Sequence, residues 1–236
     1  MESGKSDKFE IKHNKDTREI TLVPKGKKIE GCLVWLHGLG DSAEGFFPIF
    51  GDAALSPLPD SFKVRLLTAP VMSVTVNMGM RMNSWYDITN FDRSESSFNY
   101  DDVLKNSQIV KKVMDEEVEF FEGDSTKLMI GGFSQGCAMA LQSGLTYGKP
   151  LKGIIGLSGY LFPRTKLPPK LDFPIFISHG EADPVINFEY AQPSYDRLKE
   201  IDNLKNMFEF HKIPHLEHSL DIKVLELIKK FVKKIV

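Results

Sequence analysis

Short apolar runs rich in β-branched residues alternate with helical segments along this chain. The runs end in glycine or proline and lie at residues 31–38, 62–70, 127–132, 153–159, 174–180 and 207–214. Runs of this length, bounded by turn residues, are typical of buried strands. Apolar residues at helical spacing lie between these runs at 103–121 and follow them at 224–235. The alternation predicts an α/β fold, with a mostly parallel central sheet and helices on both faces.

The length of the chain indicates a single domain. It has 236 residues and a mass of 26.7 kDa, a size that α/β proteins often reach as one domain. We therefore expect residues 1–236 to form one domain, with the charged stretch at 1–16 as a mobile or peripheral N-terminal segment. The proline-rich stretch at 162–174 is predicted to be a surface loop, because too little chain follows it for a second domain.

Charge and cysteine content limit the classes of partner and compartment. With 30 basic against 32 acidic residues and a net charge of −2, the chain lacks the positive field that nucleic-acid binding requires. Cys32 and Cys137 have apolar neighbours and no metal-ligand spacing, which favours reduced core residues of a cytoplasmic protein over a disulfide. The charged N-terminus is not a signal peptide, and no stretch has the roughly 18 apolar residues of a membrane span, so any membrane contact is expected to be peripheral.

The sequence GGFSQGCAMA at 131–140 places a serine among glycines, at a predicted junction between a strand and a helix. A tight turn at this junction would force Ser134 into a strained backbone conformation and project its hydroxyl at the helix N-terminus. Gly132 and Gly136 have no side chain to collide where the strand and helix pass closely. The pattern predicts a nucleophilic serine, although G-x-S-x-G also occurs by chance in plain strand-to-helix connections.

A nucleophilic serine needs a base within hydrogen-bond reach and a carboxylate that orients the base. Asp183 follows the run at 174–180 and is the predicted acid, with Glu181 as its competitor. His215 and His218 both precede the C-terminal helix, and one of them is the predicted base. We favour His218, because packing of that helix onto the sheet would fix an imidazole at its entrance.

The order of these residues along the chain carries further information. Ser134, Asp183 and His218 occur in the order of the α/β-hydrolase fold, which differs from the orders of the chymotrypsin and subtilisin types. Each of the three follows a different predicted strand, and such an arrangement seldom arises by chance. The sequence therefore favours a catalytic triad over a structural glycine-rich turn.

A serine hydrolase also needs backbone N–H groups that stabilise the tetrahedral oxyanion. The N–H of Gln135, directly after the serine, is one expected donor. The loop LHGLGDS at 36–42 follows another predicted strand, and its glycines allow the backbone to turn its amides inward. We expect the N–H of Leu39 to be the second donor, and His37 to brace the loop rather than to act in catalysis.

With these residues identified, the chain closely resembles the acyl-protein thioesterase and lysophospholipase family of α/β-hydrolases, which is related to small bacterial carboxylesterases. The similarity runs nearly end to end, through WLHGLGDSAEGF, TAPVMSVTVNMGMRMNSWYDI, GGFSQGCAMAL, GLSGY, HGEADPVI and a terminal HS before a helix. The N-S-W-Y-D-I segment is especially specific, because the family usually has a serine, a tryptophan, an aromatic residue and an aspartate in that order. The resemblance implies the same triad and the same oxyanion donors.

The resemblance also implies a substrate class: long-chain acyl thioesters such as palmitoyl on protein cysteines, with weaker hydrolysis of lysophospholipids and short esters. It implies that Trp85 lines the acyl pocket. The segments NMGMRMNSW and LSGYLFP add Met78, Met80, Met82 and Leu161 as candidate substrate contacts, because methionine adapts to a flexible chain, although a methionine cluster is more often core filling. We expect no metal and no cofactor, and the sequence leaves both monomer and homodimer open.

The chain departs from the family pattern at two places. Glu2 stands where some members carry a cysteine that becomes lipidated, and IPHLEH introduces His215 and Glu217 where the family usually has a glycine and small apolar residues. Two other functions compete with a thioesterase. One is a general carboxylesterase or lysophospholipase with the same site, and the other is a non-catalytic binding module that keeps only the fold. The complete triad argues against the binding module.

Overall fold

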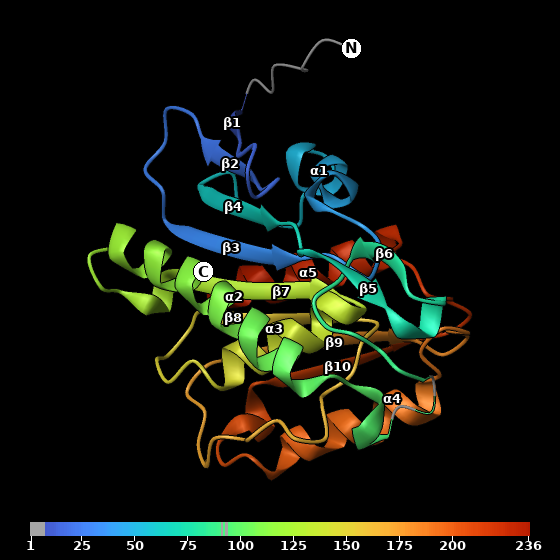
Figure 1. The fold of residues 1–236 in the computed structure, drawn as a ribbon. Helices are drawn as coiled ribbons and strands as arrows, with labels where there is room; N and C mark the ends of the chain where they lie inside the picture. Colours follow the sequence, from blue (N-terminus) through green and yellow to red (C-terminus); the bar gives the residue numbers. More distant parts are fainter. Residues whose placement is uncertain (1–7, 91, 93) are drawn as a thin grey trace.

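An eight-stranded sheet forms the centre of the molecule (Figure 1). The structure is a computed structural model that describes residues 8–90, 92 and 94–236. The strands of the sheet are β1 (Phe9–His13), β2 (Ile20–Pro24), β3 (Gly31–Leu36), β4 (Phe62–Leu67), β7 (Leu128–Phe133), β8 (Gly153–Leu157), β9 (Ile175–Gly180) and β10 (Phe208–Ile213). Their order is β1-β2-β4-β3-β7-β8-β9-β10. All pairs from β4 to β10 are parallel, which confirms the predicted mostly parallel sheet.

Helices cover both faces of this sheet, as the alternation in the sequence predicts. They are α1 (Ala43–Gly51), α2 (Tyr100–Phe120), α3 (Gln135–Leu145), α4 (Phe188–Asp196) and α5 (Ile222–Ile235). Buried side chains of α2, α3 and α4 belong to one apolar cluster, and those of α1 and α5 belong to another. Figure 1 shows α2 and α3 in front of the sheet and α5 behind it.

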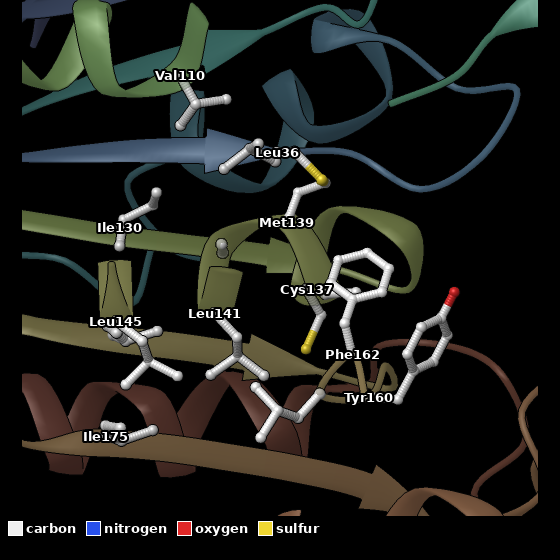
Figure 2. Close-up of a cluster of buried hydrophobic side chains, with 14 of the residues drawn as sticks. Leu36, Val110, Ile130, Cys137, Met139, Leu141, Leu145, Tyr160, Phe162 and Ile175 are labelled. Carbon is white, nitrogen blue, oxygen red and sulfur yellow. The ribbon is translucent and has the colours of Figure 1, made fainter. Parts of the chain in front are cut away.

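The two clusters exist because side chains alternate across a strand. In β3, Val34 and Leu36 join the cluster under α2 and α3, while Leu33 and Trp35 join the cluster under α1 and α5. Both faces of the strand are therefore buried, which explains its continuous apolar sequence. Figure 2 shows the first cluster, where side chains from β3, β7, α2 and α3 fill the space between the sheet and the helices.

The N-terminal strands form the antiparallel edge of the sheet, where β1 pairs with β2 and β2 pairs with β4. Residues 1–7, which include Glu2, lie outside the described residues. Of the segment 1–16 predicted to be mobile or peripheral, residues 9–13 form β1, and Phe9 is buried against the second cluster. Residues 9–13 are thus the edge strand of the sheet.

Cys32 and Cys137 are both free and buried, as predicted for reduced core residues. Burial raises the pKa of the Cys137 thiol to about 12. Among the described residues, no helix combines the length and the apolar character that crossing a membrane requires.

A small hairpin lies outside the main sheet and consists of β5 (Val71–Val74) and β6 (Met80–Asn83). It connects the end of β4 to the segment that leads into α2. In a parallel sheet the carboxyl ends of the strands meet at one edge, and loops beyond that edge collect reactive groups. The loops that follow β3, β7, β9 and β10 carry the predicted triad residues and oxyanion donors.

Candidate active site

Ser134 occupies the sharp turn between β7 and α3, with φ 56° and ψ −120°. Non-glycine residues rarely adopt this conformation, so the surrounding structure must hold it in place. A Cβ at Gly132 would lie 2.3 Å from the carbonyl oxygen of Gly136, and a Cβ at Gly136 would lie 2.2 Å from that of Leu36. The glycines therefore allow strand and helix to approach closely enough to form the strained turn predicted from GGFSQG.

The imidazole of His218 lies between Ser134 and Asp183 and is hydrogen-bonded to both. Its Nε2 is 2.8 Å from Ser134 Oγ, and its Nδ1 is 2.7 Å from Asp183 Oδ2. These atoms come from loops after three different strands, β7, β9 and β10. We call the three residues Ser134, His218 and Asp183 the relay. In the relay, Nδ1–H donates to the carboxylate, which leaves Nε2 free to accept the proton of the serine hydroxyl.

Asp183 is 4% exposed, and its two oxygens have different partners. Oδ1 accepts hydrogen bonds from the backbone N–H groups of Val185 and Ile186, each at 2.8 Å, while Oδ2 faces His218. Burial alone raises the pKa of this carboxyl, but the hydrogen bonds from His218 and Ile186 outweigh burial and lower the pKa below its ordinary value. Asp183 is therefore a carboxylate across the neutral pH range.

The loop that carries His218 is fixed to the loop that carries Asp183. The N–H of Glu181 donates to the carbonyl of Ile213 at 3.0 Å, and the N–H of Ala182 donates to that of Leu216 at 3.1 Å. On the other side, Asp221 caps α5 by accepting from the N–H of Val224 at 2.8 Å. These bonds fix the loop on both sides of His218, to the Asp183 loop before it and to the N-terminus of α5 after it.

The competing residues of the sequence hypothesis lie apart from the relay. Glu181 is exposed, and the carboxylate that faces His218 is that of Asp183. His215 is also exposed and has φ 62°, in the left-handed region that favours glycine. The departure at IPHLEH therefore places a histidine at a backbone position that glycine would adopt without strain.

The loop after β3, residues 37–41, is called here the oxyanion loop. The N–H of Asp41 donates to the carbonyl of Gly38 at 3.2 Å, which closes a turn with Gly40 at φ 80°. Leu39 lies inside this turn, where its own N–H is not part of the closing bond. A Cβ at Gly38 would lie 3.3 Å from Ser134 Cβ, so the loop runs directly beside the predicted nucleophile.

Gln135 is the first residue of α3, and the N–H groups of a first helical turn have no acceptor within their own helix. This N–H is therefore available beside Ser134, at the positive end of the helix dipole. Both predicted donors, Leu39 and Gln135, are thus adjacent to the serine. The arrangement can stabilise a negative oxygen that develops on a substrate carbon bonded to Ser134 Oγ.

His37 braces the oxyanion loop, as predicted. Burial lowers the pKa of its imidazole, so the neutral form predominates. Nδ1 is 2.6 Å from the carbonyl oxygen of Gly38, and Nε2 accepts from the N–H of Ala69 at 2.9 Å. The neutral tautomer with a proton on Nδ1 satisfies both bonds. His179 is likewise buried at the end of β9, with Nε2 at 2.8 Å from the carbonyl of Ile186.

The residues predicted to contact the substrate lie in different environments. Met78, at the tip of the β5–β6 hairpin, is 91% exposed, and Met80 is 55% exposed. Met82 is half-buried, and its Sδ would lie 3.8 Å from a Cβ at Gly40, so Met82 is the methionine next to the oxyanion loop. Trp85 and Leu161 are buried, with 2% and 1% of their surfaces exposed.

Sequence reasoning missed the groups that hold these loops together. The amide of Gln135, identified only through its backbone N–H, also bonds the backbone around Trp85 through its side chain. Asn106 donates to the carbonyl of Trp85 from 21 residues away. A sequence motif contains only neighbouring residues, so it gives no signal of hydrogen bonds between residues far apart along the chain. Within the described residues, no group of three or more His, Cys, Asp or Glu side chains could hold a metal ion.

Comparison with known proteins identifies the family of the chain. Residues 18–236 match the family described as Phospholipase/Carboxylesterase. The chain belongs to this family. It is 34% identical over 233 residues to acyl-protein thioesterase 1 of Mycosarcoma maydis, an alignment that covers 93% of this chain and 97% of that protein. It is 36% identical over 227 residues to the protein of the same name from Neurospora crassa, covering 91% and 90%.

Solved structures agree with this assignment. Arabidopsis thaliana SOBER1 matches with a TM-score of 0.70 and 33% identity, over 87% of this chain and 98% of that chain. The Bacillus cereus carboxylesterase matches with a TM-score of 0.75 at 18% identity, over 94% and 96%, and this likeness concerns the fold alone. The predicted family and the α/β-hydrolase fold are confirmed. As a family member, the protein is a hydrolase of the esterase and thioesterase class.

Proposed function

We propose that this phospholipase/carboxylesterase family member is an acyl-protein thioesterase that removes long-chain acyl groups, such as palmitoyl, from protein cysteines. The observation that carries the proposal is the relay, with 2.8 Å and 2.7 Å between its successive atoms. The substrate class is supported by the relatives from Mycosarcoma maydis and Neurospora crassa, which are named acyl-protein thioesterase 1.

The proposed reaction begins when Ser134 Oγ attacks the thioester carbon while His218 Nε2 takes the hydroxyl proton. The tetrahedral oxyanion accepts hydrogen bonds from the N–H groups of Leu39 and Gln135. The intermediate then collapses and breaks the C–S bond, and His218 returns its proton to the leaving thiolate. Water attacks the resulting acyl-enzyme in the same way, so that the products are a free cysteine thiol and a fatty acid.

The relay suits this cycle because Asp183 is already negatively charged before the substrate binds. Asp183 stays ionised, since its lowered pKa keeps it deprotonated at neutral pH. A carboxylate at Nδ1 favours the tautomer with an unprotonated Nε2, and it stabilises the imidazolium that forms during attack. The acid therefore assists both proton transfers without being protonated itself.

The acyl chain is proposed to lie along the β5–β6 hairpin. Met82 lies next to the oxyanion loop, and Met78 and Met80 extend the apolar surface outward. Leu161 would form its deeper wall. The exposed side chains of Val71, Met78 and Met80 also make this hairpin the proposed region of peripheral membrane contact, where S-acylated proteins are anchored.

The test is a kinetic series of acyl chain lengths from acetyl to palmitoyl, offered as thioesters on a cysteine peptide and as oxyesters on the matching serine peptide. We expect kcat/KM to rise with chain length, by up to about 0.8 kcal/mol per buried methylene, and to be higher for thioesters. A flat response to chain length would remove the lipid substrate from the proposal. Ser134→Ala controls for hydrolysis outside the site.

A general carboxylesterase or lysophospholipase is the second candidate, favoured by the family description Phospholipase/Carboxylesterase. The same series distinguishes it, because an oxyesterase would hydrolyse the serine-linked esters at least as efficiently as the thioesters. A lysophospholipid offered beside the acylated peptide completes the comparison.

A further inference from the structure

The segment at residues 83–87, called here the bridge segment, joins β6 to the chain that leads into α2. Its central residue, Trp85, is 2% exposed and makes three hydrogen bonds to three different parts of the fold. The indole Nε1–H donates to the carbonyl of His37 at 2.9 Å. Its backbone N–H donates to Gln135 Oε1 at 2.8 Å, and its carbonyl accepts from Asn106 Nδ2 at 2.6 Å.

The first two of these bonds end on the two elements that carry the predicted oxyanion donors. His37 begins the oxyanion loop, two residues before Leu39, and Gln135 is itself the second donor. Trp85 is therefore bonded through its side chain to one donor element and through its backbone to the other. A change in the position of Trp85 would move the two N–H groups relative to each other.

The side chain of Gln135 is held on the bridge segment by further bonds. Its Nε2 donates to the carbonyl of Tyr86 at 2.8 Å and to Ser84 Oγ at 3.0 Å, while the Ser84 hydroxyl donates to the same Tyr86 carbonyl at 2.7 Å. Gln135 is 2% exposed, so these bonds form away from water, where an unpaired amide is costly. The start of α3 is therefore fixed to the bridge segment as a unit.

The bridge segment also holds the far end of the oxyanion loop. The carbonyl of Asn83 accepts from the N–H of Gly40 at 2.8 Å, and Asn83 Nδ2 donates to the carbonyl of Asp41 at 2.6 Å. Together with the indole bond to His37, the segment contacts the loop on both sides of Leu39. The loop is thus fixed in position by the same segment that fixes Gln135.

We propose that Trp85 is a positioning residue for the oxyanion hole, which sets the Leu39 and Gln135 N–H groups at the spacing that the tetrahedral oxyanion requires. The inference rests on the proposed function, since it assumes that these N–H groups bind the oxyanion. It assigns Trp85 a role in the transition state that is distinct from lining the acyl pocket. Preorganised donors act only when they already point at the oxygen, so small displacements reduce the rate.

The chain supplies a matched control in Trp35, the other of its two tryptophans. Trp35 is also 2% exposed, but it lies in the cluster under α1 and α5, on the opposite face of the sheet. Its indole Nε1 is buried and has no hydrogen-bond partner among the described residues. Replacing either tryptophan by phenylalanine removes the same atoms from the core, but only Trp85→Phe removes an N–H that is bonded to the oxyanion loop.

The experiment compares wild type, Trp85→Phe and Trp35→Phe by kcat and KM on one acyl thioester. It also measures inhibition by an alkyl trifluoromethyl ketone and by the matching methyl ketone. Ser134 Oγ adds to the carbonyl carbon of the fluorinated ketone while His218 Nε2 takes the hydroxyl proton, and the carbonyl oxygen becomes a hemiketal oxyanion in the hole. The methyl ketone binds without this addition and reports ground-state contacts.

We expect Trp85→Phe to lower kcat and the affinity for the trifluoromethyl ketone by the same factor, about tenfold, the effect of losing one buried hydrogen bond. KM and the affinity for the methyl ketone should stay at the wild-type values. Trp35→Phe should change neither kcat nor either inhibition constant, and both variants should have a lower melting temperature through lost packing.

Three results would overturn the proposal. In one, Trp85→Phe matches Trp35→Phe in kcat. In another, Trp85→Phe raises KM and weakens the methyl ketone, as expected of a pocket wall. In the third, the affinity for the trifluoromethyl ketone is unchanged while kcat falls. Failure of the proposed function is distinguishable, because the wild-type protein would then neither hydrolyse the thioester nor bind the trifluoromethyl ketone more tightly than the methyl ketone.

A second variant keeps the proposal testable if Trp85→Phe does not fold. Gln135→Met retains the backbone N–H of Gln135 but removes the amide that holds the bridge segment. It should give the same paired loss in kcat and in trifluoromethyl ketone affinity. Where both variants fold, the double variant should lose less than the product of the single losses, because both changes act through one connection. If the double variant instead lost the full product of the two single losses in kcat, Trp85 and Gln135 would act independently and the proposed connection would be wrong.

Discussion

Two groups of polar side chains that contain buried carboxylates lie along the same sheet, and they hold these carboxylates in opposite ways. The first, called here the ion cluster, consists of Glu19, Lys63, Arg65, Glu116 and Glu117 and joins the start of β2 and β4 to α2. Lys63 Nζ lies 2.7 Å from Glu117 Oε1, and Arg65 Nη2 lies 2.9 Å from Glu19 Oε2. In this cluster each buried carboxylate faces a permanent cation.

The second group is the relay, beyond the carboxyl ends of the strands. There the carboxylate of Asp183 is held by the backbone N–H groups of Val185 and Ile186 and by the imidazole of His218. Backbone amides do not transfer a proton to a carboxylate, whereas imidazole gains and loses a proton near neutral pH. Among the described residues, the acceptor at hydrogen-bond distance from the Ser134 hydroxyl is Nε2 of His218, at 2.8 Å.

The contrast shows how surroundings assign different tasks to the same functional group. A carboxylate paired with lysine or arginine joins elements of structure, since neither partner changes its charge during function. A carboxylate held by neutral donors beside an imidazole can take part in proton transfer. Changes in the relay should therefore affect turnover with little effect on stability, and changes in the ion cluster should do the reverse.

The largest effect is expected from His218→Gln, with His215→Gln as its matched control. Loss of the base should lower kcat on the order of 10⁶, because triad members act as a unit. His215 lies three positions earlier on the same loop but outside the relay, so its replacement should change kcat by less than about tenfold. Steady-state kinetics of the two purified variants provides the measurement. If His215→Gln lowered kcat more than His218→Gln did, His215 would be the base. The contrast between the relay and the ion cluster would then be wrong.

The next effect in size is expected from Asp183→Asn, which should lower kcat by about 10⁴ because the amide supports the wrong imidazole tautomer. Glu181→Gln, an equally conservative change at an exposed residue two positions earlier, should leave kcat unchanged. Both variants should keep the wild-type circular dichroism spectrum. If Glu181→Gln were the damaging change, the acid would be misassigned.

At the ion cluster we expect a smaller free-energy change, and it concerns the stability of the fold instead of kcat. Glu117→Gln should lower the free energy of unfolding by about 3 kcal/mol, because Lys63 and Arg65 lose a buried partner. Glu119→Gln, an exposed position on the same helix, should change it by less than about 0.5 kcal/mol. Urea denaturation measures both, and kcat should be unchanged in both. A loss of kcat at Glu117 with unchanged stability would remove the distinction between the two groups.

Much of this fold follows from local sequence pattern. The six predicted strands are present as β3, β4, β7, β8, β9 and β10. Of these, β3, β7, β8 and β9 are buried along nearly their whole length and have continuous apolar sequences, whereas β4 and β10 include partly buried polar residues. The relay residues lie in the loops after β7, β9 and β10, so their meeting at one edge of the sheet could be expected.

The remaining elements give weaker signals for physical reasons. The edge strand β1 has the sequence FEIKH, in which only Phe9 is buried, so it lacks a continuous apolar run. Helices α1 and α4 contain Pro48 and Pro193, residues that normally argue against a helix interior. The hydrogen bonds of Trp85 join residues 48 and 50 positions apart, and no local pattern records contacts of that range.

The central claim, that Ser134 is the nucleophile of the relay, is tested most directly by identifying the serine that an alkyl fluorophosphonate modifies. We expect peptide mass mapping to find a single adduct, on Ser134, that is absent in Ser134→Ala, a variant whose kcat should fall on the order of 10⁶ with the fold intact. An adduct on another serine, or a Ser134→Ala variant that keeps more than a few per cent of wild-type turnover, would contradict the account.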